Sequence, residues 1–237
     1  MAESRYQRAR AARRPMLELA GTAKDYGDLV ALQPCDLAVP AGQVVALVGH
    51  NGSGKSTLLR IVAGILDATG GTVTIAGTPA GSSEARAATS FVPDDPVLYD
   101  DLSVREHLEY VSAIHGAPAP AEAIDELVGQ LGLAERVDDL PARFSRGLRQ
   151  KAALAVGLVR PFSLLLIDEP FVGLDAPGRA ALLGLLDEAH RSGATLVIAT
   201  HEPSFVEQVD RCVALRDGAV IHDGKATARD VLDLVGA

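Results

Sequence analysis

Short apolar runs alternate with glycine-rich and polar segments along the chain. The runs at 44–48, 164–167 and 196–199 consist of Val, Leu, Ile and Ala. Runs of this length and composition are typical of strands buried on both faces of a parallel sheet. Further strands, bounded by Gly, Pro or Asp, are predicted at 16–20, 35–39, 72–76, 212–215 and 219–222. The Asp217-Gly218 pair between the last two strands predicts a two-residue hairpin turn.

Other segments have the period of an amphipathic helix. Segment 104–115 places its apolar residues nearly on one face of a helix, and the Gly-Ala-Pro-Ala-Pro sequence after it ends that helix. Further helices are predicted at 58–62, 121–131, 148–159 and 176–192. Strands that alternate with helices predict an α/β domain over 16–237, with a helical insertion at about 95–160.

Composition narrows the class of protein. The chain has 237 residues, 48% of them hydrophobic, which is enough for one large α/β core with a smaller subdomain. A formal net charge of −9 and an aromatic content of 4% with no Trp disfavour nucleic-acid binding. The two cysteines lack metal-ligand spacing, which indicates buried thiols. No apolar run approaches the roughly 18 residues that span a bilayer.

Residues 1–15 form a basic arm. We expect a disordered, solvated tail here, with weak attraction to an anionic membrane face as the alternative. The arm lacks the hydrophobic centre of a signal peptide. Its arginines are Arg5, Arg8, Arg10, Arg13 and Arg14.

Residues 49–57 fit the phosphate-binding pattern G-x-x-x-x-G-K-[ST] and lie between a predicted strand and a predicted helix. A loop that wraps a triphosphate with backbone N–H groups needs glycine where a side chain would block the approach. Lys55 can reach the β- and γ-phosphates, and the Ser56 hydroxyl can ligate Mg²⁺. The expected binding residues are Gly49, Asn51, Gly52, Ser53, Gly54, Lys55, Ser56 and Thr57.

A second candidate site follows the apolar run 164–167, where Asp168 and Glu169 emerge together. Ligands bind at the carboxyl ends of strands in open parallel sheets. Asp168 is therefore placed to hold Mg²⁺ or its water shell, and Glu169 to polarise an attacking water as a general base. A lone Asp-Glu pair after an apolar run is commonly a solvated strand end, but the phosphate loop upstream favours the catalytic interpretation.

Together these motifs resemble the nucleotide-binding subunit of an ATP-binding cassette (ABC) transporter, over about residues 16–224. Residues 49–56 are similar to the Walker A motif and 164–168 to the Walker B motif, and Glu169 matches the catalytic glutamate. The remaining elements occur in the family's order. They are Tyr26 for the adenine-stacking aromatic, Ser145-Arg146-Gly147 for the Leu-Ser-Gly-Gly-Gln signature, Gly173-Leu174-Asp175 for the D-loop and His201 for the switch histidine.

The resemblance implies a P-loop NTPase core with a mixed, mainly parallel sheet, an antiparallel β-subdomain and an inserted helical subdomain. Two subunits would pack head to tail, so that Ser145 and Gly147 of one face the γ-phosphate held by Lys55 of the other. Asp175 of the D-loop would be a further ATP-binding residue, and His201 would sense the γ-phosphate. ATP and Mg²⁺ are the implied cofactors, and ATP would hold the dimer together until hydrolysis releases it.

Two segments depart from the family pattern, the one around Asp94 and the signature. Asp94 stands where the family usually has a Gln that contacts Mg²⁺ and the attacking water, and we expect it to act as a metal ligand or water-positioning residue. Arg146 replaces the first signature glycine; it either adds positive charge near the site or faces solvent, and we favour solvent. Leu148 stands at the position of the signature glutamine.

The resemblance implies ATP hydrolysis that powers transport, with export favoured, through a separate membrane-spanning permease subunit. A second nucleotide-binding subunit, identical or different, is the other implied partner, and no nucleic acid is expected. The chain would then be peripheral on the cytoplasmic face of the membrane, with residues 93–99 and 104–107 facing the permease. The alternatives are an ABC-type ATPase with a soluble assembly partner and a catalytically weak regulatory module.

Overall fold

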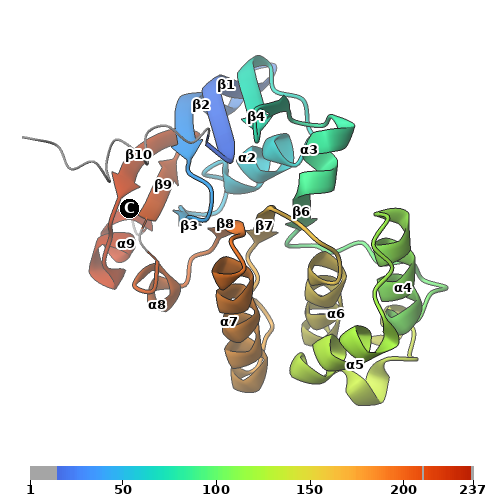
Figure 1. The fold of residues 1–237 in the computed structure, drawn as a ribbon. Helices are drawn as coiled ribbons and strands as arrows, with labels where there is room; N and C mark the ends of the chain where they lie inside the picture. The colour runs from blue at the N-terminus through green and yellow to red at the C-terminus, as the bar shows by residue number, and fades with distance from the viewer. Residues whose placement is uncertain (1–14, 210, 236–237) are drawn as a thin grey trace, which may run out of the picture.

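The computed structural model describes residues 15–209 and 211–235, so the arm at 1–14 lies outside the described residues and its predicted disorder stays a prediction. Strands and helices alternate along the chain (Figure 1). They are β1 (Leu17–Tyr26), β2 (Leu29–Val39), β3 (Val44–Val48), α2 (Lys55–Val62), β4 (Gly70–Ile75), β5 (Thr78–Pro79), α3 (Ser83–Ala88), β6 (Thr89–Val92), α4 (Val104–Ile114), α5 (Ala121–Gln130), α6 (Arg146–Leu158), β7 (Leu164–Asp168), α7 (Ala176–Arg191), β8 (Thr195–Ala199), α8 (Pro203–Val206), β9 (Arg211–Arg216), β10 (Ala219–Gly224) and α9 (Ala228–Val235), with 3₁₀ turns at Ala134–Arg136 and Pro141–Arg143.

A six-stranded sheet in the order β10-β9-β3-β8-β7-β6 forms the centre of the molecule. Every neighbouring pair from β9 to β6 is parallel, and β10 is antiparallel to β9 at the edge. The mixed, mainly parallel core expected from the sequence is therefore confirmed. Since parallel strands end at the same edge, the segments that follow β3, β6, β7 and β8 all emerge together there.

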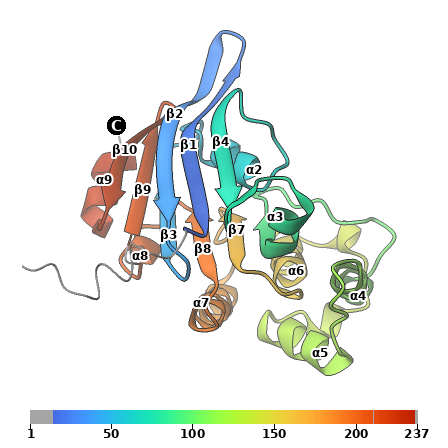
Figure 2. The same ribbon diagram turned by 45° about the horizontal axis from the view of Figure 1, so that its top comes forward.

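Successive residues of the central strands point to opposite faces of the sheet. Leu47 and Leu166 pack with the second sheet, of order β2-β1-β4-β5, and with α2, in one buried cluster. Val48 and Ile167 pack into the other buried cluster, which the helices α4 to α9 cover. Figure 2 shows the antiparallel sheet on one side of the core and α4, α5 and α6 grouped on the other. No helix among residues 15–209 and 211–235 combines the length and apolar character needed to span a bilayer.

Several elements differ from the sequence prediction. Strands β1 and β2 extend much further than the predicted 16–20 and 35–39, because their added residues form a largely exposed hairpin without a strong apolar pattern. Strand β6 was not predicted, since it is short and begins with Thr89 and Ser90. Both hydroxyl residues are nevertheless buried, and Ser90 Oγ donates a hydrogen bond of 2.6 Å to the carbonyl of Gly157 in α6.

A glycine sets how closely α6 approaches β6. A Cβ atom on Gly157 would overlap Cγ2 of Val92, so only glycine lets the helix pack at this distance. Just after α6, the buried Arg160 guanidinium donates to carbonyls near the end of α3, among them those of Ala87 and Thr89. These contacts hold α6 against β6. Because the signature segment begins α6 and Asp94 follows β6, they also position those two parts of the site.

We predict that Gly157→Ala lowers the free energy of unfolding by about 1–3 kcal/mol, because the added methyl group must displace Val92 or the helix. Gly184→Ala is the matched control, since Gly184 lies on an exposed face of α7 with open space around it. There the better helix propensity of Ala should leave stability unchanged or raise it by up to about 1 kcal/mol. Urea unfolding of both variants checks this, and equal effects at the two positions would contradict it.

Candidate nucleotide-binding site

The phosphate loop joins the end of β3 to the first turn of α2, as predicted. Gly54 directly before the helix has φ +106, a conformation that favours glycine, and a Cβ atom there would lie 2.7 Å from the carbonyl oxygen of Ala31 on β2. The first backbone N–H groups of α2 have no carbonyl partner within the helix, so this end of the helix is suited to bind an anion.

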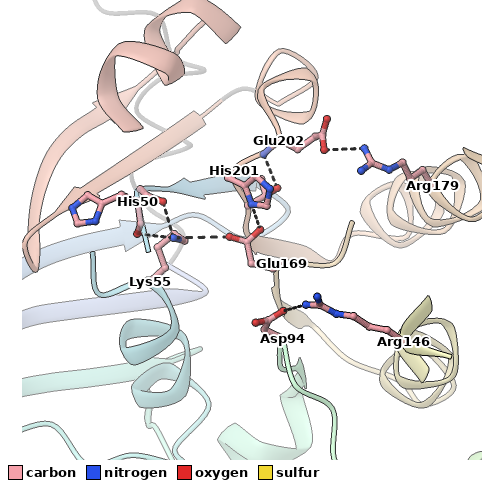
Figure 3. A network of polar contacts seen from close by, with 10 residues as sticks. His50, Lys55, Asp94, Arg146, Glu169, Arg179, His201 and Glu202 are labelled. Atoms are coloured by element: carbon pink, nitrogen blue, oxygen red, sulfur yellow. Dashed lines mark hydrogen bonds and ion pairs between the residues drawn. The ribbon is translucent and has the colours of Figure 1, made fainter. Parts of the chain in front are cut away.

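Lys55 is buried beneath this loop with only 6% of its side chain exposed. Its Nζ donates hydrogen bonds to the carbonyls of Gly49 at 2.7 Å and His50 at 3.2 Å, and lies 3.9 Å from Oε1 of Glu169. Burial lowers the pKa of the ammonium group, and the carboxylates of Glu169 and Asp168 oppose that effect. Lys55 is thus a desolvated cation directed towards the Glu169 carboxylate of the second motif (Figure 3).

A pocket of about 180 Å³ lies where the two motifs meet. It brings together seven of the eight predicted loop residues with both carboxylates of the second motif and with Asp94, although these segments are far apart in sequence. Gly49 instead lies at the start of the loop and contacts Lys55 through its carbonyl. The lining residues are Ala31, Asn51, Gly52, Ser53, Gly54, Lys55, Ser56, Thr57, Asp94, Asp168 and Glu169. Ala31 was not predicted, because a small residue on a distant strand carries no sequence signal.

Asp168 has the environment of a metal ligand. Its side chain is 2% exposed and lies near the Ser56 hydroxyl, and its Oδ1 atom is buried with no hydrogen-bond partner. Burial raises the pKa of this carboxyl group, and the nearby Asp94 carboxylate raises it further. A buried, unpartnered carboxylate oxygen is costly unless a cation satisfies it. Mg²⁺, which prefers few carboxylates together with phosphate and water oxygens, fits this position.

Glu169 adopts a backbone conformation that is rare for a residue with a side chain. Its φ is +49, in the left-handed region, and its N–H donates to the carbonyl of Ala199 at 2.8 Å. Strain of this kind persists where the surrounding structure enforces it. The carboxylate points into the pocket, where Oε2 lies 2.8 Å from Nδ1 of His201. Figure 3 shows Glu169 between Lys55 and His201, so the predicted base and switch histidine are in direct contact.

Two of the residues that depart from the family pattern, Asp94 and Arg146, face each other within one chain. Arg146 Nη2 lies 3.9 Å from Asp94 Oδ1, and the two side chains are 72% and 50% exposed. Arg146 is therefore largely exposed, as we favoured, and its guanidinium also lies beside Asp94, one of the residues that line the pocket. This pair was missed because the two residues are distant in sequence and no motif links them.

The remaining signature and D-loop residues lie outside the pocket lining. Ser145 caps α6, and its Oγ accepts the Leu148 N–H at 3.4 Å. A Cβ atom on Gly147 would lie 2.5 Å from the carbonyl of Gly173, so the signature and the D-loop are in close backbone contact. Asp175 caps α7 and forms an ion pair of 2.9 Å with Lys151 on α6, which together lower the pKa of its carboxyl group. Within this chain the predicted roles of these residues in ATP binding stay predictions.

Tyr26 also lies outside the pocket lining. It ends β1 in the exposed hairpin, its side chain is 54% exposed, and Lys24 Nζ lies 5.0 Å from the centre of its ring. The ring offers an accessible π-face, and its predicted stacking on adenine stays a prediction.

Known proteins share this arrangement. The family model described as "ABC transporter" matches residues 32–172. The chain is 34% identical over 224 residues to the macrolide export ATP-binding/permease protein MacB 1 of Aeromonas hydrophila, covering 89% of this chain and 35% of that protein. It thus spans about a third of the length of that relative. It is 39% identical over 189 residues to the aliphatic sulfonates import ATP-binding protein SsuB 2 of Burkholderia cenocepacia, covering 79% of this chain and 68% of that protein.

A solved structure agrees with these relatives. The fold matches a dimeric ATP-binding cassette in a post-hydrolysis state, bound to ADP and Pi, with a TM-score of 0.81 and 25% identity, over 89% of this chain and 98% of the other. Together with the phosphate loop, the carboxylates at the end of β7 and the helical region between them, these matches show what the chain is. It belongs to the ABC transporter family and is an ATP-binding, ATP-hydrolysing domain of that family.

Proposed function

We propose that Glu169 is the general base for ATP hydrolysis and that hydrolysis drives export through a separate membrane-spanning partner. The observation that carries the catalytic part is the contact of Glu169 with both Lys55 and His201, beside the unpartnered oxygen of Asp168. A base, a phosphate-binding cation and a metal-ligating carboxylate within one small pocket are the components that phosphoryl transfer to water requires.

The chain's own groups then take these parts. Lys55 and the N–H groups at the start of α2 would hold the phosphates, and Ser56 and Asp168 would hold Mg²⁺. When bound, Mg²⁺ supplies positive charge that stabilises the transferring phosphoryl group. Glu169 takes a proton from the water that attacks the γ-phosphorus, the bond to the β-phosphate oxygen breaks, and ADP and Pi leave. Since a carboxylate only accepts hydrogen bonds, Nδ1 of His201 donates to Glu169, and a second donation from Nε2 to phosphate requires the imidazolium form.

We propose further that the site is completed by a second nucleotide-binding subunit. Ser145, Gly147 and Asp175 lie outside the pocket of their own chain, which is what a contribution to another subunit's ATP requires. The dimeric arrangement of the ADP-bound relative supports this assignment. In a two-fold dimer each chain would supply one phosphate loop and one signature segment.

The partner surface is a groove of about 330 Å³ between β6 and the helices α4 and α6. Val97 on its edge is 93% exposed and Tyr99 54% exposed, and the surrounding acidic side chains are exposed as well. Cytoplasmic segments of membrane proteins carry an excess of Lys and Arg, which complements this charge. The groove would therefore bind such a segment of the membrane-spanning partner. The acidic residues are Asp95, Asp100, Asp101 and Glu109.

Part of the surface predicted from the sequence is wrong. Val104 and His107 are buried, with 0% and 2% exposure, and cannot face a partner. His107 instead supports the exposed segment 93–99 of the proposed surface. Its Nε2 accepts the Tyr99 N–H at 2.8 Å, and its Nδ1 lies 2.7 Å from the Ser103 carbonyl. A carbonyl only accepts, so Nδ1 carries the proton and the ring is neutral.

We favour export, the direction in the name of the relative that aligns with 89% of this chain. Import is the alternative direction, since relatives named for import align with 79% and 87% of the chain. The fusion of an ATP-binding and a permease part in the name of the first relative supports a membrane partner for this chain. Such a partner would place the chain at the cytoplasmic face of the membrane. A soluble assembly partner stays the alternative, and the identity of the co-purifying protein separates the two.

We predict that Glu169→Gln lowers the rate of ATP hydrolysis at least about 100-fold while ATP binding is kept, because the amide preserves the shape but cannot accept the proton. The variant should accumulate as an ATP-bound dimer. Phosphate release and size-exclusion chromatography with MgATP measure the two effects. Glu188→Gln, at an exposed position on α7, is the control and should behave as wild type. Hydrolysis by Glu169→Gln at the wild-type rate would exclude Glu169 as the base.

We predict that Val97→Asp abolishes co-purification of the membrane-spanning partner from detergent-solubilised membranes without lowering the basal ATPase rate of the isolated chain. The substitution places a charge where the complex with the partner would bury an apolar side chain. Because Val97 does not line the ATP pocket, the new charge should not weaken nucleotide binding. Ile221→Asp is the control, because Ile221 is exposed on β10 at the opposite edge of the sheet. Retention of a protein with several membrane helices by Val97→Asp would contradict the assigned surface.

A further inference from the structure

Asp94 and Arg146 connect two parts of the fold that have separate places in the site. Asp94 follows β6 and lines the ATP pocket, whereas Arg146 lies in the first turn of α6, between Ser145 and Gly147. The gap between their charged groups is 3.9 Å (Figure 3). The stem of Arg146 passes over the D-loop, where a Cβ atom on Gly173 would lie 3.6 Å from its Cγ.

The pocket has an excess of negative charge before any nucleotide binds. Three carboxylates, those of Asp94, Asp168 and Glu169, line it together with one ammonium group, Lys55. The Asp94 carboxylate is close enough to raise the pKa of Asp168. Lys55 is directed towards Glu169 and the loop carbonyls, so it does not serve as the counter-ion of Asp94. Arg146 is the cation that the structure places beside Asp94.

We propose that Arg146 is a positioning residue that holds the Asp94 carboxylate when no Mg²⁺ is bound and competes with Mg²⁺ for it. The inference rests on the proposed use of this pocket for MgATP. Binding of the metal draws Asp94 towards Asp168, and Arg146 is released from the pair. A guanidinium in the first turn of α6 is then free to face the triphosphate of a second subunit. Binding of Mg²⁺ in the pocket of one subunit thereby favours contact of its signature segment with the nucleotide of the second subunit.

The size of the effect follows from exposure. Both side chains are at least half exposed, so the pair is screened by solvent and salt and shifts a binding equilibrium only a few-fold. A small, salt-sensitive competition suits a regulatory contact, since MgATP at cellular concentration overcomes it.

The experiment measures binding of a fluorescent ATP analogue as Mg²⁺ is titrated, without relying on turnover. In Arg146→Gln the Mg²⁺ concentration for half-maximal binding should fall about two- to fivefold, because the competing charge is gone. Arg146→Lys, which keeps the charge, should restore the wild-type value. Arg143→Gln is the matched control, since Arg143 is an exposed arginine just before the signature and outside this pair. It should leave the Mg²⁺ dependence unchanged.

A double-mutant cycle shows whether Arg146 acts through Asp94. In an Asp94→Asn background, Arg146→Gln should cause no further shift. The same shift with and without the Asp94 charge would overturn the proposal, because Arg146 would then act on the nucleotide directly; an unshifted Arg146→Gln would overturn it as well. Wild-type protein that binds no MgATP analogue would instead refute the proposed function of the pocket, so the two failures are distinguishable.

Discussion

The parallel pairing of the central strands is the constraint on which the site depends. Leu47 on β3 and Asp168 on β7 both pair with Ala199 on β8, so the segments after all three strands emerge at one edge. The period of a strand is two residues, and a slip of one residue would turn Asp168 towards the opposite face of the sheet. The buried apolar residues on both faces of these strands make such a slip costly, and the hydrophobic core thereby fixes the geometry of the polar pocket.

The same edge concentrates carboxylates where a triphosphate must bind. Gathering these carboxylates is unfavourable in free energy until a cation is present. The unpartnered oxygen of Asp168 and the strained backbone of Glu169 are the groups that bear this cost. With the roles proposed above, a site built this way would discriminate against free nucleotide and favour nucleotide that brings Mg²⁺. Lys55 moderates the repulsion but remains bonded to two loop carbonyls, which leaves part of the charge for the metal to neutralise.

Sequence patterns predicted the parts of the structure that are encoded locally. Continuous apolar runs identified β3, β7 and β8, and fixed spacing identified the phosphate loop and the Asp168-Glu169 pair. The contacts between segments carried no such signal. The pairing of Lys151 with Asp175, the support of Tyr99 by His107 and the approach of Arg146 to Asp94 arise only once the segments that carry these residues are packed together. Strand β6 itself was missed because it begins with two buried hydroxyl residues, and the partner of Ser90, the carbonyl of Gly157, lies 67 residues away.

Those contacts also explain how events at the nucleotide can reach a second subunit. Gly147 is in close backbone contact with Gly173, and Lys151 binds the residue that caps α7, so the signature and the D-loop are held as one unit. Asp94 contacts that unit through Arg146 while facing the metal position. The proposed shift of Asp94 on metal binding would therefore act on the signature and the D-loop, which lie outside the pocket of their own chain. The helices α6 and α7 can transmit such a shift better than a loop, because packed helices move as rigid units.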